Sequence, residues 1–349
     1  MESNGRNYSI SCVRFIAMCF IVICHIMQAE GVASCIGSMR IEWAYWFNVG
    51  VQMFLFISGC LYGSRKCVDI FKFYKKSFSK VLVDYYIYIV VFIIFSASTS
   101  VIMITKDDII ALLTLSGTIF ELAHLWYVPT ILFCYLLLPI VIAFVNEIDK
   151  EKDYKFVLKV VLLLLVVHCV IHYQFDRFEA PWINCFVIGA IYSRLIHRRY
   201  VIRKIFFASN VILAITIIVI QLRFVIPESF ENFGIMSYSE FVGYGHVFWG
   251  ITLVEIIKYV YSRCHNTNDG FWLLDWSDRY SYDVYLVHHA LIQGGLSLLR
   301  YINPTWVAIV VDVFVIVILS MVLNICSSRI RRLTYLCRGK NGENAKSLS

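Results

Sequence analysis

Residues 125–145 read LWYVPTILFCYLLLPIVIAFV and contain no charged side chain. A helix needs about 20 predominantly apolar residues to cross the hydrocarbon core of a bilayer, so this stretch predicts a membrane-spanning helix. The rest of the chain agrees, because 60% of its 349 residues are hydrophobic, 16% are charged and the mean hydropathy is +0.72. Soluble domains carry about 25% charged residues, and a water-soluble fold is therefore excluded.

Similar apolar runs, separated by clusters of charge, predict about ten transmembrane helices in an all-α, polytopic bundle. The runs lie near 9–28, 46–63, 83–104, 125–145, 156–173, 182–196, 202–222, 239–261, 281–300 and 306–327. Two are weaker than the rest, since 182–196 is short and 239–261 carries four ionisable side chains. No linker or repeat divides the chain. We expect one membrane-embedded domain over residues 1–330 and a short basic and polar cytoplasmic tail over residues 331–349, disordered from Arg338 onward.

The positions of Lys and Arg predict the orientation, because basic loops are retained on the cytoplasmic side. With the N-terminus inside, 24 of the 31 basic residues lie in inner segments and five in outer segments. Both termini are therefore predicted to be cytoplasmic, which requires an even number of spans. This asymmetry also explains the net charge of +7, so no nucleic-acid partner is expected. The predicted location is a multi-pass position in a bacterial inner membrane, with the lipid bilayer as partner; the oligomeric state is left open.

Cysteine usage indicates neither disulfides nor a metal site. Eight of the 12 cysteines fall in predicted spans, only Cys35 falls in an outer loop, and none shows the C-x-x-C spacing of a zinc site. Arg14 interrupts the first apolar run, so we expect this run to be a retained span and not a cleaved signal peptide.

The first predicted span contains two ionisable side chains, Arg14 and His25. They are eleven residues apart, about 20° beyond three full helical turns, so they share one face at about 16.5 Å along the axis. Ionisable residues inside a bilayer are costly and mark functional sites. The guanidinium suits an anionic or carbonyl group, and the imidazole can exchange a proton near neutral pH. The residues alone leave an alternative open, in which Arg14 snorkels to the headgroups and His25 caps the interface.

The segment from Arg14 to His25, RFIAMCFIVICH, resembles the R-x10-H motif of acyltransferase family 3, the polytopic membrane acyltransferases that use acyl-CoA. Four further segments resemble motifs of this family in the same order along the chain. They are NVGVQMFLFISG at 48–59, HLWYV at 124–128, the helix glycine Gly189 and YLVH at 285–288. The resemblance runs from about residue 8 to about residue 327.

This resemblance implies an acyl-CoA-dependent O-acyltransferase without a metal, with acetyl-CoA as the default co-substrate. The implied acceptor is a hydroxyl of a surface carbohydrate or lipid-linked sugar near the outer face. His25 would be the catalytic base. Arg14 would be a second catalytic residue that holds the donor or stabilises developing negative charge.

The segment 73–85, FYKKSFSKVLVDY, departs from the family's basic pattern F-x-K-K-R-F-x-R-I-x-P-P-Y. Ser77 and Lys80 stand where the family has arginine, and the prolines are absent. We expect Lys72, Lys75, Lys76 and Lys80, in a loop over 64–80, to attract the phosphates of CoA as point charges. The alternative is that these lysines only fix the topology.

Three further residues are predicted to bind the acceptor: His124, Trp126 and His288. Trp126 could equally anchor at the membrane interface. Ser58-Gly59 is interpreted as a close helix contact and not as a nucleophile. Asp283 is expected to pair with Arg279 at the inner end of its span.

Two rival functions remain open. In a transporter or flippase for a glycan or small anion, Arg14 would bind substrate and His25 would relay protons. A membrane sensor or scaffold would bind no CoA. Thioester hydrolysis or CoA release by the purified protein separates the enzyme from both rivals.

Overall fold

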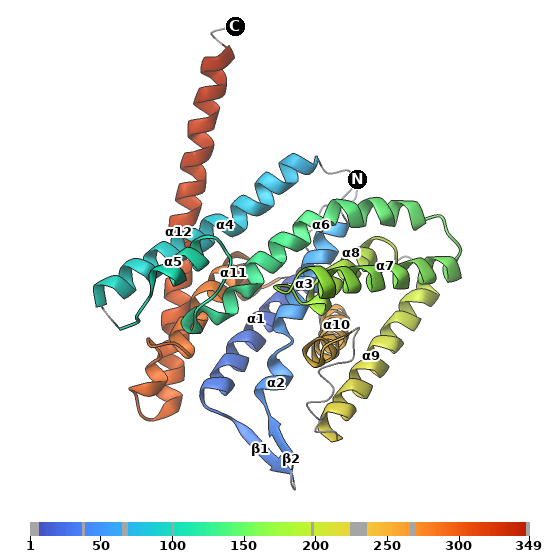
Figure 1. Cartoon of the computed structure of the whole chain (residues 1–349), viewed down its shortest axis with the longest axis horizontal. Coiled ribbons are helices and arrows are strands. Elements are labelled where there is room, and N and C mark those ends of the chain that lie inside the picture. The colour runs from blue at the N-terminus through green and yellow to red at the C-terminus, as the bar shows by residue number, and fades with distance from the viewer. Residues whose placement is uncertain are drawn as a thin grey trace. The chain divides into compact units, whose positions relative to one another are not determined.

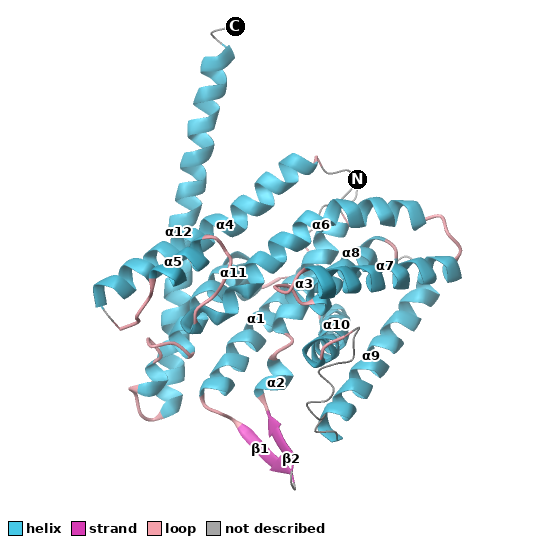
Figure 2. Cartoon of the chain, viewed as in Figure 1, coloured by secondary structure: helices cyan, strands magenta, loops and turns pink. Residues whose placement is uncertain are grey.

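The computed structural model describes residues 7–36, 39–64, 69–99, 101–196, 199–223, 236–265 and 270–346. Figure 2 shows that these residues form helices, loops and one short hairpin. The helical class predicted from the sequence is confirmed.

The chain divides into two compact units, and each is assembled from two separate stretches. The first unit contains Met1–Val68 and Thr130–Asp278, and the second contains Asp69–Pro129 and Arg279–Ser349. The single membrane-embedded domain expected over residues 1–330 stays a prediction. The two divisions after residue 129 and after residue 278 fall inside helices, which is why no change in composition marks them.

The first unit holds most of the helices labelled in Figure 1. Its elements are α1 (Tyr8–Ala29), β1 (Ala33–Ile36), β2 (Met39–Glu42), α2 (Ala44–Phe47), α3 (Gly50–Gly63), most of α6 (Tyr127–Ile148), α7 (Asp153–Gln174), α8 (Ala180–Arg194), α9 (Tyr200–Arg223), α10 (Tyr238–Cys264) and the start of α11 (Trp272–Ile292).

Helices α3 and α8 form the closest contact in this unit. A Cβ at Gly59 would lie 2.1 Å from the carbonyl oxygen of Phe186, and a Cβ at Gly189 would lie 2.2 Å from that of Phe56. Only glycine permits backbones to approach this closely. The interpretation of Ser58-Gly59 as a packing position is confirmed.

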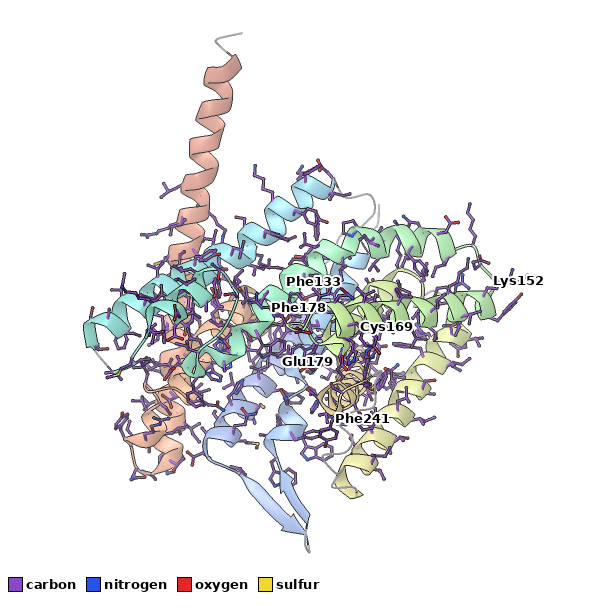
Figure 3. The ribbon with its side chains drawn as sticks, viewed as in Figure 1. Phe133, Lys152, Cys169, Phe178, Glu179 and Phe241 are labelled. Atoms are coloured by element: carbon purple, nitrogen blue, oxygen red, sulfur yellow. The ribbon has the colours of Figure 1, made fainter. Side chains whose placement is uncertain are left out.

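Helices α1 and α10 also pack on α3. A Cβ at Gly50 would lie 2.5 Å from the carbonyl oxygen of Ala17, so α1 is held against the start of α3. Helix α8, in which twelve residues are buried, also contacts α7 and α10. Figure 3 labels Phe133 of α6 and Phe178, whose stacked rings have centroids 4.6 Å apart just before α8 begins. Helix α1 therefore rests on a densely packed support.

The second unit contains α4 (Ile70–Thr99), α5 (Lys106–Leu113), the 3-10 helix η1 (Phe120–Trp126), the rest of α11, the 3-10 turn η4 (Leu298–Arg300) and α12 (Thr305–Lys346). Buried polar contacts join these elements. Arg331 of α12 pairs with Asp84 of α4, and the Tyr85 hydroxyl donates to the carbonyl oxygen of Leu112 at 2.7 Å. Asp283 accepts a hydrogen bond from Asn324 Nδ2 at 2.8 Å. The partner found for Asp283 is thus an amide on another helix, and not the expected Arg279.

Seven described helical segments are long and apolar enough to cross a membrane: Tyr8–Ala29, Ala44–Gly63, Ile70–Thr99, Phe120–Ile148, Asp153–Gln174, Tyr200–Ile220 and Thr305–Leu333. They make the protein an integral membrane protein. The other three predicted spans correspond to α8, α10 and α11. Helix α8 has 15 residues and is only about 22 Å long, while α10 and α11 carry several charged side chains. The count of about ten and the orientation stay predictions.

Three features differ from the expected organisation. Residues 33–42, expected as an outer loop, contain the antiparallel strands β1 and β2, with Ala33 opposite Glu42; the side chain of Cys35 lies outside the described part. Helix α4 begins at Ile70, so the four lysines expected in a loop lie on a helix. Helix α12 extends to Lys346, through most of the segment expected to be a disordered tail.

Candidate active site

Helix α1 carries both predicted catalytic residues without interruption. The side chain of Asn7 caps it, since Asn7 Oδ1 accepts a hydrogen bond from Ser9 N at 3.1 Å, and the helix then runs to Ala29. The condition for the predicted geometry, one continuous helix from Arg14 to His25, is met. The two side chains therefore lie on one face, about 16.5 Å apart along the axis.

Arg14 is held by a carboxylate that the sequence analysis did not identify. Arg14 Nη1 donates to Asp278 Oδ1 at 3.0 Å, and Ser11 Oγ donates to Asp278 Oδ2 at 2.6 Å. One turn earlier, the Tyr8 hydroxyl donates to Asp275 Oδ1 at 3.3 Å. Asp278 is 264 positions from Arg14, and nothing in its local sequence identifies it as the partner. These contacts fix the N-terminal half of α1 against the start of α11.

His25 lies at the other end of α1 and is half-buried. Its Nδ1 is 2.8 Å from Oε1 of Gln28, one turn further along the helix. An amide oxygen can only accept, so this contact is made by the tautomer that carries its proton on Nδ1. Nε2 is then the unprotonated nitrogen, which is the form that a general base requires. Gln28 is a functional candidate that the sequence analysis overlooked, although its i+3 spacing from His25 could have indicated it.

The predicted phosphate-binding lysines form one exposed face of the first turns of α4. Lys72, Lys76 and Lys80 repeat every four residues, and Lys75 lies beside them. Phe73 and Ser77 point to the opposite, buried face. The helix therefore presents four ammonium groups together to solvent, and this face can attract polyanions.

The predicted acceptor residues His124 and His288 are brought together, in the second unit. Their ring centroids are 5.0 Å apart, and the two residues are 4% and 0% exposed. His124 Nε2 is 3.1 Å from the carbonyl oxygen of Leu286, and the Tyr285 hydroxyl donates to the carbonyl oxygen of His124. These contacts tie η1 to α11. Such burial suits an internal hydrogen-bonding role better than direct contact with an acceptor.

His289 completes this cluster. Its ring stacks on that of His124 at 4.8 Å, and its Nδ1 is 2.9 Å from the carbonyl oxygen of Glu121. Trp126 is half-buried and packs edge-on against Tyr127, with ring centroids 6.3 Å apart. Of the three predicted acceptor residues, Trp126 is thus the one with accessible surface.

One group of described side chains could hold a metal ion: His168, His172 and Glu240. The H-x3-H pair on α7 was not predicted as a metal site, because the prediction rested on cysteine spacing. An i,i+4 pair of histidines places two imidazoles on one helix face and is a recognisable signal.

Comparison with known proteins finds a family match over most of the chain. The model of the acyltransferase 3 family, described as an acyltransferase domain, matches residues 7–325. Neither a curated protein nor a solved structure matches the chain. The match covers nearly the whole chain, including α1 with Arg14 and His25, and the chain therefore belongs to the acyltransferase 3 family of acyltransferases.

Proposed function

We propose that this acyltransferase moves an acyl group, acetyl in the first instance, from acyl-CoA to a hydroxyl of a surface carbohydrate or lipid-linked sugar. The observation that carries the proposal is the continuous helix α1 with a basic imidazole at one end and a carboxylate-held guanidinium at the other. Family membership supplies the reaction class. The proposed location is a bacterial inner membrane.

His25 is the proposed general base. Nε2 takes the proton of the acceptor hydroxyl while the oxygen attacks the thioester carbonyl. The C–S bond then breaks, the acceptor oxygen keeps the acyl group as an ester, and the sulfur leaves as the CoA thiolate. The thiolate recovers the proton from the imidazolium, which yields CoA thiol and returns His25 to its neutral form.

Arg14 is proposed to hold the donor and not to stabilise the oxyanion. A carbonyl within reach of His25 lies about three helical turns from Arg14, which is too far for a hydrogen bond. A guanidinium has five N–H donors, and the contact with Asp278 uses Nη1. The other donors are proposed to bind a polar group along the extended pantetheine arm.

The lysine face of α4 is proposed to attract the phosphates of CoA. Four ammonium groups on one exposed helix face raise the local concentration of a polyanionic donor. Because ammonium groups act as point charges and not as planar forks, this contribution should be sensitive to salt. Trp126 is the proposed acceptor contact, with His124 and His288 supporting the segment that carries it.

The test uses the full-length protein in detergent with acetyl-CoA and a soluble oligosaccharide acceptor. We expect CoA thiol release that depends on acceptor, together with an acetylated product seen by mass spectrometry. Acceptor-independent export or uptake in vesicles without thiol release would instead establish a transporter and overturn the proposal. Mass spectrometry of surface glycans from cells with and without the protein identifies the acceptor.

A further inference from the structure

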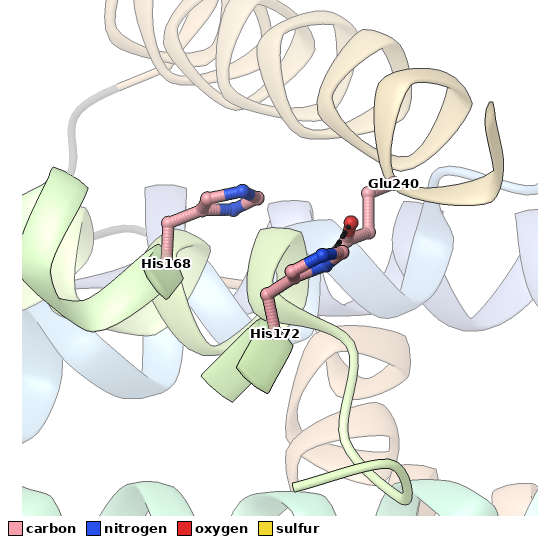
Figure 4. Close-up of side chains that lie close together, drawn as sticks. All are labelled: His168, His172 and Glu240. Carbon is pink, nitrogen blue, oxygen red and sulfur yellow. Dashed lines mark hydrogen bonds and ion pairs between the residues drawn. The ribbon is translucent and has the colours of Figure 1, made fainter. Parts of the chain in front are cut away.

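Helices α7 and α10 bring two imidazoles and a carboxylate together at one place in the first unit. His168 and His172 lie one turn apart near the end of α7, and Glu240 lies in the first turn of α10. Figure 4 shows both imidazoles projecting from α7 toward Glu240. One potential ligand atom from each residue lies within 4.8 Å of the other two.

We propose that these three residues form a binding site for a divalent transition metal, with zinc as the first expectation. Two histidines and one glutamate are an established ligand set for zinc, which leaves a fourth position for water. The proposal is independent of the proposed acyl transfer reaction, in which none of these residues is assigned a role.

The geometry is close to that of a metal site. Ligand atoms at about 2.0–2.2 Å from a tetrahedral zinc lie about 3.3–3.5 Å from one another. His172 Nδ1 and Glu240 Oε2 are already 2.8 Å apart. The two imidazole rings are nearly parallel, at 15° with centroids 5.7 Å apart. Small rotations of these side chains are therefore enough to close the site around an ion.

Neighbouring polar groups form a second layer of hydrogen bonds around the proposed metal ligands. His168 Nδ1 is 3.0 Å from the Tyr244 hydroxyl, which accepts a hydrogen bond from Asn184 Nδ2 at 2.8 Å. Glu240 Oε2 also accepts from Ser237 N at 2.8 Å. Metal-ligating histidines generally bond through their second nitrogen to such a partner, which fixes the ring. Asn184 belongs to α8, so this layer connects all three helices.

Burial and charge also favour a cation. His168 and Glu240 are 4% and 6% exposed. A second carboxylate, Glu179, is labelled in Figure 3 and interacts with the charge of Glu240. Glu179 Oε1 accepts from Ser239 Oγ at 3.0 Å. Two carboxylates and two imidazoles in a partly buried place attract a dication that neutralises them.

The site would tie the end of α7 to the start of α10. Both helices pack on α8. A metal ion bound by residues of α7 and α10 would cross-link these two helices. With the predicted orientation, His172 lies toward the outer side, so the ion would be acquired from outside the cytoplasm.

The test measures metal content in the full-length protein in detergent. The protein is stripped with EDTA, incubated with zinc, desalted and analysed by inductively coupled plasma mass spectrometry. We expect about one zinc per chain in the wild type and at least a tenfold weaker affinity in His168→Gln, His172→Gln and Glu240→Gln. His265→Gln and Glu147→Gln make the same changes at exposed positions and should bind zinc as the wild type does.

A second measurement requires no variant. X-ray absorption of the zinc-loaded wild type should show two imidazoles and oxygen ligands at about 2.0–2.2 Å. Three results would each overturn the proposal. The zinc could be coordinated by oxygens alone or by sulfurs, the wild type could lack stoichiometric zinc, or the three ligand variants could bind as much zinc as the wild type.

Discussion

Two residues on α1 are proposed to carry the chemistry, and the structure shows a contact for each. His25 has Gln28 at Nδ1, and Arg14 has Asp278 at Nη1. The first pair is local and the second joins distant parts of the sequence. The same helix thus carries the proposed proton-transfer residue at one end and the guanidinium that contacts Asp278 at the other.

His25→Ala should lower acyl transfer by about 100- to 10,000-fold, which is the usual contribution of a general base. His25→Gln should lose as much, because an amide cannot accept the proton. CoA binding should persist, since Arg14 and the α4 lysines are unchanged. The measurement is CoA thiol release, with binding followed by calorimetry. The matched control is His265→Ala, because His265 is exposed at the end of α10. A wild-type rate of thiol release in folded, membrane-inserted His25→Ala protein would show that His25 is not the general base.

Gln28→Leu removes the acceptor for the Nδ1 proton, so kcat should fall about two- to tenfold, the equivalent of one hydrogen bond. KM should be unchanged, because Gln28 positions the base and does not bind substrate. Gln28→Glu keeps an oxygen acceptor and should restore kcat. A kcat equal to that of the wild type in Gln28→Leu would show that the contact with His25 has no catalytic part.

Arg14→Lys should lower acyl transfer nearly as much as Arg14→Ala does. An ammonium group lacks the planar set of N–H donors with which a guanidinium can bind Asp278 and the donor together. Arg14→Ala also leaves the Asp278 carboxylate without this charged partner, which costs about 3–5 kcal/mol when such a pair is buried. The 12% exposure of Asp278 and the 28% exposure of Arg14 reduce this cost somewhat.

The double variant Arg14→Met/Asp278→Leu separates anchoring from donor binding. It removes both charges together, so thermal stability should recover relative to Arg14→Ala. Activity should stay lost if Arg14 binds the donor. Recovery of both stability and activity would show that Arg14 only anchors α1.

At the scale of the element, hydropathy locates the apolar middle of a helix but not its ends. The span predicted at 83–104 is the apolar part of α4, which begins at Ile70 because the lysine-bearing turns bury Phe73 and Ser77. Two short elements were missed although the sequence carries signals for them. Thr105 and Asp108 form a capping box that starts α5, and Gly37-Ser38, between the strand residues, is a typical hairpin dipeptide.

The α3–α8 contact gives a prediction for an element pair. A Cβ at Gly189 would meet the carbonyl oxygen of Phe56 at 2.2 Å, and backbone cannot move aside as a side chain can. Gly189→Ala should therefore destabilise the protein by at least about 1–3 kcal/mol. Gly295→Ala is the control, because its nearest contact is an ordinary 3.4 Å. Equal melting temperatures for both variants in detergent would contradict this packing.

At the scale of the whole molecule, the sequence predicts a membrane protein well and its internal division poorly. Apolar length and the family motifs suffice for the helical class and for α1. The two compact units are not visible in the sequence, because each combines stretches that are distant along the chain. Hydropathy reports which residues avoid water and not which helices contact one another. The Arg14–Asp278 and Arg331–Asp84 pairs were missed for the same reason.

The topology itself is the last prediction, and it depends on the number of spans. Among the described residues, seven helical segments are apolar enough to cross a membrane, which is an odd number. If only these crossed, the two termini would lie on opposite sides. If α8, α10 and α11 cross as well, the number becomes ten and both termini are cytoplasmic, as the distribution of Lys and Arg predicts.

Reporters fused after Ser349 distinguish the two cases. A fluorescent protein that folds only in the cytoplasm should be bright when it is fused there. Alkaline phosphatase is active only on the outer side, so it should be inactive at the same position. An impermeant maleimide should label Cys35 in intact cells, with Cys35→Ser as control, and should label Lys76→Cys only after permeabilisation. Labelling of Cys35 from the cytoplasmic side alone would show that the protein has the opposite orientation to the predicted one. An active C-terminal phosphatase together with external labelling of Cys35 would indicate an odd number of spans, as expected if α8, α10 and α11 all remain short of a full crossing.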